Sequence, residues 1–155
     1  MKRRTFMKGS LAGSVLAVAA GSGLLKPTDV LAAGWPKGAF DAQSEADMLS
    51  SLYGSSSASA SGKIRIKAPI QAENGRVVPV KVQASLANVE SIAVAVAKNP
   101  RPLATSVNLS GGATGYYSTR IKMGKTSKVT AYVKAGGKLH TASKTVKVTV
   151  GGCGG

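Results

Sequence analysis

The stretch Val78-Pro79-Val80-Lys81-Val82-Gln83-Ala84-Ser85-Leu86 decides the fold class, because apolar and polar residues alternate along it. A period of two is typical of a strand with one buried and one wet face. The pattern recurs from Lys63 onward, between turn-forming pairs such as Gly136-Gly137 and Asn74-Gly75, where Asn-Gly tolerates a positive φ. Pro79 lacks a backbone donor, which indicates a sheet edge or a bulge.

About seven short strands with regular turns favour an all-β fold, an immunoglobulin-like β-sandwich over residues 63–150. Aromatic residues make up only 5% of the 155-residue chain, so Val, Ile, Ala and Leu must fill the core. A core so poor in large side chains leads us to expect that a partner subunit completes it. The expected strands are residues 63–67, 78–86, 92–96, 103–109, 116–123, 129–135 and 139–150.

The region before the strands, residues 34–62, divides into a helix and a linker. Between Phe40 and Tyr53 apolar residues recur about every four positions and acidic residues come early, so we expect a short helix that stops at Gly54. Residues 55–61 are all Ser or Ala, a composition typical of a flexible spacer.

Residues 1–33 are expected to be a cleaved export signal. The basic start contains Arg3-Arg4, an apolar run rich in Ala and Gly follows over residues 11–25, and the small residues Ala32-Ala33 stand at the expected cleavage site. This order is typical of signal peptides, and the paired arginines favour the twin-arginine route. We therefore expect a periplasmic protein, with an uncleaved membrane anchor as the less favoured alternative.

The composition disfavours a self-sufficient enzyme. The single Cys excludes a disulfide framework within the chain and a Cys-rich metal site. One His and six scattered acidic residues leave little material for a metal cluster or a conventional acid/base site. His140 lies in a strand pattern and is expected to be a surface or packing residue rather than a ligand. The chain is therefore predicted not to be an enzyme.

The chain is strongly basic. Removal of residues 1–33 would leave 16 Lys and Arg against 5 Asp and Glu, a net charge of +11. Nucleic acid is an implausible partner for an exported protein, and no nucleic-acid-binding motif is present. Two interpretations remain open: solvated strand faces, or a positive field that attracts anionic substrates or acidic partners.

The chain ends on a thiol surrounded by glycine, in Gly151-Gly152-Cys153-Gly154-Gly155. Because glycine has the widest backbone freedom, we expect Gly151, Gly152, Gly154 and Gly155 to form a flexible arm that presents Cys153. The thiol could be buried, could form an intermolecular disulfide, or could carry a covalent group to partner enzymes; the last explains the glycines best. A catalytic nucleophile is disfavoured because no base adjoins the thiol.

This terminal motif, with its preceding strand, resembles the SoxY family of thiosulfate-oxidation carrier proteins. The resemblance continues through the chain after the expected signal, and the twin-arginine leader also suits the family. The supporting blocks are residues 72–75 with 78–80, 99–103, 118–123 and 137–139.

The resemblance implies that the chain is a covalent sulfur carrier without its own catalytic centre, metal or cofactor. Cys153 is then the attachment site, on a swinging arm of glycines, in a periplasmic heterodimer with a SoxZ-like β-sandwich. A SoxAX-like cytochrome joins thiosulfate to the sulfur, a SoxB-like hydrolase releases sulfate, and a SoxCD-like dehydrogenase oxidises the remaining sulfane sulfur. No nucleic acid or membrane is implied as a partner.

Two other functions share the same sequence features. An exported β-sandwich module could act by disulfide exchange with a partner, and would form a mixed disulfide rather than a sulfur-oxyanion adduct. A related carrier domain could instead serve another dehydrogenase system, such as a methanol-type quinoprotein cluster.

Overall fold

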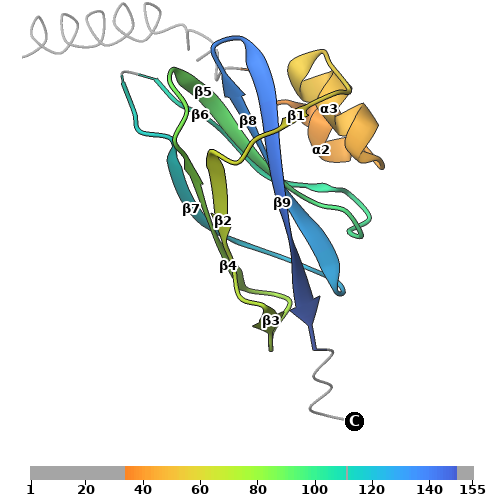
Figure 1. Cartoon of the computed structure of the whole chain (residues 1–155). Helices are drawn as coiled ribbons and strands as arrows, with labels where there is room; N and C mark the ends of the chain where they lie inside the picture. The colour runs from red at the N-terminus through yellow and green to blue at the C-terminus, as the bar shows by residue number, and fades with distance from the viewer. Residues whose placement is uncertain (1–33, 111, 150–155) are drawn as a thin grey trace, which may run out of the picture. The chain divides into compact units, whose positions relative to one another are not determined.

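The computed structural model describes residues 34–110 and 112–149. The chain divides by its contacts into residues 1–35 and residues 36–155, and every helix and strand below belongs to the second unit. The helices are α2 (Lys37–Asp41) and α3 (Glu45–Tyr53). The strands are β1 (Ser59–Ala60), β2 (Ile64–Lys67), β3 (Gln71–Ala72), β4 (Val78–Ala84), β5 (Val89–Val96), β6 (Leu103–Asn108), β7 (Tyr116–Ile121), β8 (Ser127–Ala135) and β9 (Lys138–Val148) (Figure 1).

The strands form two sheets that pack face to face. The larger has the order β1-β9-β8-β5-β6, with β3 also paired to β9, and the smaller has the order β2-β4-β7. Burial alternates along β4: Val78, Val80 and Val82 are fully buried in the core between the sheets, and the residues between them are exposed. The prediction of an all-β, immunoglobulin-like β-sandwich with a short helical start is confirmed.

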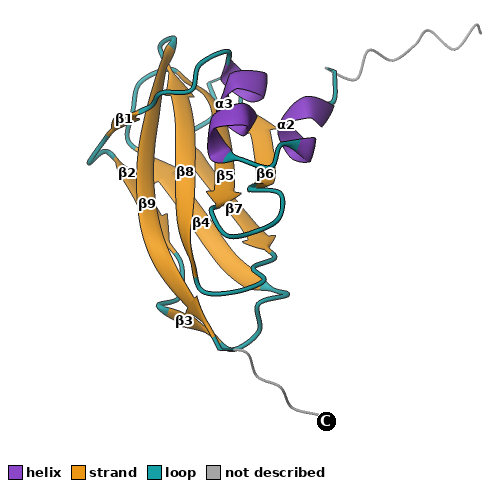
Figure 2. Ribbon diagram, turned by 90° about the vertical axis from the view of Figure 1, so that its right-hand side faces the viewer, coloured by secondary structure: helices purple, strands orange, loops and turns teal. Residues whose placement is uncertain are grey.

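Strand β5, which lies between β8 and β6 in the larger sheet, is buried on both faces. Ile92, Val94 and Val96 belong to the core between the sheets, whereas Ala93 and Ala95 pack against the helices. The small Ala side chains leave room for helices to lie close to the sheet, and the branched side chains fill the sandwich. Figure 2 shows α2 and α3 on this outer side. The alternation in β5 therefore reflects two buried faces.

The sequence predicts one helix over residues 40–53; the structure has α3 over the later part of this range and a separate helix, α2, that begins earlier, at Lys37. Ser44 is extended and caps α3, because its hydroxyl oxygen accepts a hydrogen bond from the N–H of Asp47 at 3.0 Å. This cap separates α3 from α2. The expected stop is confirmed: Gly54 adopts a φ of 69°, in the left-handed region that favours glycine. The helix residues buried against the sheet are Ala39, Met48 and Leu49.

A hydrogen bond between two side chains attaches α3 to the larger sheet. The hydroxyl of Tyr132, on β8, donates to Oε2 of Glu45, in the first turn of α3, at 2.5 Å. Burial and the adjacent Glu45 carboxylate raise the pKa of Tyr132 above its ordinary value of 10.0. The neutral hydroxyl is therefore the form that the fold favours.

Replacing Tyr132 by Phe is expected to destabilise the fold by about 1.5 kcal/mol, since a hydrogen bond to a charged group is lost. The raised pKa means that the contribution is fully present below pH 10 and declines as the pH rises further, so the variant should lose less stability in alkali than the wild type. Urea unfolding at neutral and alkaline pH measures both effects.

The control is Tyr116→Phe, because Tyr116 is half exposed and makes no hydrogen bond through its hydroxyl in the described structure. Equal losses in the two variants would show that the Tyr132–Glu45 bond contributes nothing measurable.

Two strands of two residues each pair with β9 in parallel and were not predicted. β1, which lies inside the expected linker, pairs with His140 and Thr141 near the start of β9. β3 pairs with Lys147 and Val148 at its end. A period cannot be read from two residues, so no pattern marks either strand. Figure 2 shows them at opposite ends of β9.

Pro79 lies in β4, the middle strand of the smaller sheet, rather than in an edge strand. Its partner on β7 is Arg120. On the other side β2 ends at Lys67, opposite Lys81, so no residue of β2 pairs with Pro79. β4 is therefore the middle strand of the sheet, but at Pro79 it has a neighbour on one side only. The missing N–H of the proline costs little stability there, because no residue of β2 needs it as a hydrogen-bond donor.

The predicted export signal, residues 1–33, lies outside the described residues. Within residues 34–110 and 112–149, no helix is long and apolar enough to cross a membrane.

Candidate functional site

The terminal motif that the sequence singles out lies outside the described residues. It consists of Cys153 with Gly151, Gly152, Gly154 and Gly155. The structure describes the chain up to Thr149, directly after β9. The described part of the candidate site is therefore residues 147–149, which we call the strand root.

The segment around β3 holds one side of the strand root. The N–H of Lys147 donates to the carbonyl oxygen of Ile70 at 2.9 Å, and the N–H of Thr149 donates to that of Ala72 at 3.1 Å. The hydroxyl of Thr149 adds a second hydrogen bond to the Ala72 carbonyl at 3.2 Å. Main-chain pairing thus continues to the last described residue.

A threonine side chain holds the other side of the strand root. Oγ1 of Thr126 accepts a hydrogen bond from the N–H of Val148 at 3.0 Å and donates to the carbonyl oxygen of Val148 at 3.4 Å. The regular pairing of β8 with β9 ends at Ser127 and Val146, and beyond it the Thr126 hydroxyl takes the place of the main-chain hydrogen bonds. The backbone that leads toward Cys153 is therefore fixed from both sides.

Gly75 brings the turn before β4 against the strand root. Its carbonyl oxygen accepts the N–H of Met123 at 2.7 Å. A Cβ at this position would collide with the Met123 carbonyl oxygen and lie 2.9 Å from Cγ1 of Val148. The turn forms as predicted, with Oδ1 of Asn74 accepting from the N–H of Arg76 at 2.9 Å. The reason for the glycine differs, however: its φ is not positive, and what it provides is space.

Three of the sequence blocks that carry the family resemblance meet beside the strand root. The amide of Asn99 donates to the carbonyl oxygen of Lys122 at 2.8 Å and accepts from the N–H of Gly124 at 3.1 Å. This fixes the turn after β7, where Met123 bonds to Gly75. Because the blocks come from three separate connections, no spacing in the sequence indicates that they meet.

His140 lies at the other end of β9, in a pocket of about 290 Å³. Among the described residues, no hydrogen bond joins its ring to a serine of this pocket. The described residues also include no cluster of three or more His, Cys, Asp or Glu that could hold a metal ion. The polar residues that line this pocket with His140 are Tyr53, Ser55, Ser57, Ser59, Lys134 and Lys138.

The lysine of this pocket that lies on β8 is already paired. Lys134 Nζ lies 3.2 Å from Oε2 of Glu90, and the N–H of Gly137 donates to Oε1 of the same carboxylate at 2.8 Å. These contacts, the Gly137 bond foremost, lower the pKa of Glu90. The charge of Lys134 is thus neutralised by Glu90, whereas Lys138 makes no ion pair among the described residues.

Comparison with known proteins identifies the family. A family model described as sulfur oxidation protein SoxY matches residues 49–153, a range that includes the whole sandwich and ends at the cysteine. None of the curated proteins compared with the chain is significantly similar to it.

Solved structures agree with this match. The sulfur carrier protein SoxY from Chlorobium limicola f thiosulfatophilum is 36% identical, with a TM-score of 0.61, over 67% of this chain and 94% of that one. A superoxide reductase (neelaredoxin) from Ignicoccus hospitalis is 19% identical, with a TM-score of 0.50, over 56% of this chain and 80% of that one. At that identity the second likeness shows the fold alone.

The fold and the two matches define the class of protein: the chain is a β-sandwich protein of sulfur oxidation. The match to a sulfur carrier structure supports a sulfur-carrier role. The chain belongs to the SoxY family, because the family model matches more than half of its length.

Proposed function

We propose that the chain carries sulfur covalently on Cys153 during thiosulfate oxidation. The observation that carries this proposal is the extent of the family match, which reaches residue 153, the only cysteine of the chain. A carrier that binds sulfur through sulfur needs a thiol. In this sequence a single residue can provide it.

Loading is an oxidation, and its balance requires an electron acceptor. The Cys153 thiol loses its proton, its sulfur bonds to the outer sulfur of thiosulfate, and two electrons pass to a SoxAX-like cytochrome. The product is a cysteine S-thiosulfonate. Water at a SoxB-like hydrolase then takes the sulfonate group, so that hydrogen sulfate leaves and a cysteine persulfide remains. A SoxCD-like dehydrogenase then oxidises that sulfane sulfur to a sulfonate: three water molecules supply the oxygen atoms, six electrons pass to the dehydrogenase and the protons are released. A second hydrolysis returns the free thiol and a second hydrogen sulfate.

In this proposal the chain presents the sulfur and its partners perform the catalysis. Gly151, Gly152, Gly154 and Gly155 act as a swinging arm, because no Cβ beside Cys153 limits its entry into a narrow cleft. Five residues reach at most about 17 Å. The strand root, held by hydrogen bonds on both sides, anchors the arm to the sandwich.

The proposed setting is the periplasm. Residues 1–33 would direct export by the twin-arginine route, which carries folded proteins, and a SoxZ-like β-sandwich would form a heterodimer with the mature chain. The family match and the basic, paired-arginine start support this setting.

Intact-protein mass spectrometry tests the carrier role directly. The mature protein, purified from cells grown with thiosulfate, is expected to show an added mass that matches bound thiosulfate or sulfane sulfur and that disappears on reduction. Peptide mapping should place this mass on Cys153. Cells grown without thiosulfate provide the control.

A bare thiol under both conditions, or a plain disulfide dimer, would contradict the carrier role. A mixed disulfide with another protein in place of a sulfur adduct would favour disulfide exchange instead.

A further inference from the structure

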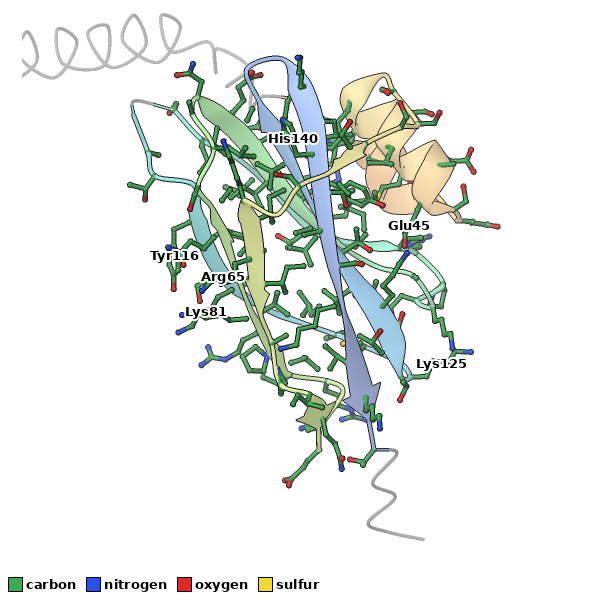
Figure 3. The ribbon with its side chains drawn as sticks, in the orientation of Figure 1. Glu45, Arg65, Lys81, Tyr116, Lys125 and His140 are labelled. Carbon is green, nitrogen blue, oxygen red and sulfur yellow. The ribbon has the colours of Figure 1, made fainter. Side chains whose placement is uncertain are left out.

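The outer face of the smaller sheet gathers basic side chains from three strands. Burial alternates along β2, β4 and β7, and their outward positions are all exposed. Cross-strand pairing places Arg65 beside Gln83 and Gln83 beside Tyr116, and places Lys67 beside Lys81. We call these residues, together with Arg120, the cationic face. Figure 3 shows Arg65, Lys81 and Tyr116 on the same outer side of the sheet.

Acidic side chains are absent from this face. The acidic residues of the described structure lie on the helices, in the turn before β4 and at the start of β5, and none lies on β2, β4 or β7. Every ion pair among the described residues is made elsewhere. Figure 3 shows Glu45, on α3, at the opposite side of the ribbon from Arg65 and Lys81. The positive charge of the face is therefore not balanced within the described chain.

One pair of residues on the face works against the fold. Lys67 and Lys81 are direct cross-strand partners and both are exposed. Like charges in this position repel and destabilise a sheet. An acidic or neutral residue at either position would remove the repulsion, so the face costs the isolated chain stability. A binding partner that supplies negative charge would recover it.

We infer that the cationic face is a docking surface for an acidic surface of a partner protein. The sheet holds the four cations at fixed spacings, so they can select an acidic surface of matching geometry. A flexible basic segment, in contrast, adapts to any polyanion. Tyr116 is half exposed beside them, and Tyr and Arg are enriched where proteins bind proteins. Charge complementarity of this kind steers encounter and fixes register.

Other anionic ligands fit the face less well. A sheet that binds RNA stacks two or three bases on aromatic side chains, whereas these three strands expose a single aromatic, Tyr116. A surface that binds anionic lipid combines basic residues with apolar ones that enter the membrane, and within the strands no large aliphatic side chain points outward. The attraction between a small anion and this face would be weak, because salt screens interactions between charges on an open surface.

The size of the face indicates a transient complex. β4 has seven residues and thus extends about 23 Å, and the face spans three strands, an area on the order of 300 Å². A stable interface buries about 800 Å² on each partner. Docking here should be weak, fast and dependent on ionic strength. The inference does not depend on the thiol, so a chain without Cys153 should dock equally well.

The test compares two triple variants of the full mature chain that remove the same charge. One changes the face (Arg65→Gln, Lys81→Gln, Arg120→Gln), and the other changes exposed lysines elsewhere (Lys98→Gln, Lys128→Gln, Lys138→Gln). The probe is a fluorescent polyglutamate peptide, followed by anisotropy over a range of salt. We expect the face variant to bind about tenfold more weakly with a reduced salt dependence, and the control variant to change by less than about twofold.

Equal weakening in both variants would overturn the inference, because net charge alone would then explain binding. Absence of peptide binding by the wild type would also overturn it. So would a face variant that loses affinity only for a single-stranded oligonucleotide or for vesicles of phosphatidylglycerol and phosphatidylcholine, since the partner would then belong to another class.

A single charge reversal separates docking from stability. Lys81→Glu places a carboxylate opposite Lys67, so it should raise the melting temperature by about 1–4 °C while weakening peptide binding. A variant that is merely misfolded would instead show both a lower melting temperature and weaker peptide binding. Unchanged peptide affinity in this variant would overturn the inference.

Discussion

Replacing Cys153 by serine is expected to remove all covalently bound sulfur from the chain and to leave its melting temperature unchanged. A serine hydroxyl cannot form the sulfur–sulfur bond that loading requires, and the chain has no second thiol to replace it. With the purified partner enzymes, thiosulfate-dependent turnover should fall to background. Mass spectrometry measures the adduct, and thermal unfolding checks the fold. Retained turnover would contradict the carrier role.

A relocated thiol provides the matched control for this prediction. Ser143 is exposed on β9, in the ordered ladder with β8, so Ser143→Cys in the Cys153→Ser background restores one accessible thiol on a rigid strand. We expect no loading, because a thiol fixed on a strand cannot enter an enzyme cleft. Loading at position 143 would show that the terminal glycines have no role in presentation.

Replacing Gly75 by valine is expected to destabilise the fold by about 3 kcal/mol and to lower the melting temperature by about 10 °C. Any Cβ at this position meets the backbone carbonyl of Met123, which cannot rotate away as a flexible side chain could, and crowds Val148 as well. Because the clash adjoins the strand root, hydrogen exchange at the N–H groups of Val148 and Thr149 should accelerate more than exchange in β5.

Gly62 provides the control for this variant, because a Cβ there has no atom within 4 Å and its φ is not positive. Gly62→Val should change stability by less than about 0.5 kcal/mol. Similar losses in both variants would mean that the branched side chain itself, and not the lack of space at Gly75, governs the result, because the lost freedom of glycine alone would stabilise the fold.

Periodicity predicted the seven longer strands because each has enough residues to show a period. Burial alternates along β4 around fully buried valines, and turn residues separate the strand from its neighbours. The same rule could not find β1 or β3, whose places depend on β9 and not on their own side chains. It also could not show that the alanines of β5 are buried, since only the presence of the helices buries them.

The site divides in a similar way between local and tertiary information. Cys153 stands out in the sequence because it is unique and surrounded by glycine, and it belongs to the residues that the structure does not describe. The strand root depends on contacts among Ala72, Thr126 and Val148, which lie far apart in the chain. The basic residues of the cationic face are likewise scattered in sequence, so their common orientation emerges only when β2, β4 and β7 pair.

The long pairing of β9 has a mechanical consequence. A pull applied at Thr149 along the axis of β9 runs perpendicular to the hydrogen bonds that join β9 to β8. Force in this direction loads the bonds of the eleven-residue strand together, in shear, and does not peel them apart one at a time. A pull along this axis is therefore resisted by the whole β8–β9 ladder at once.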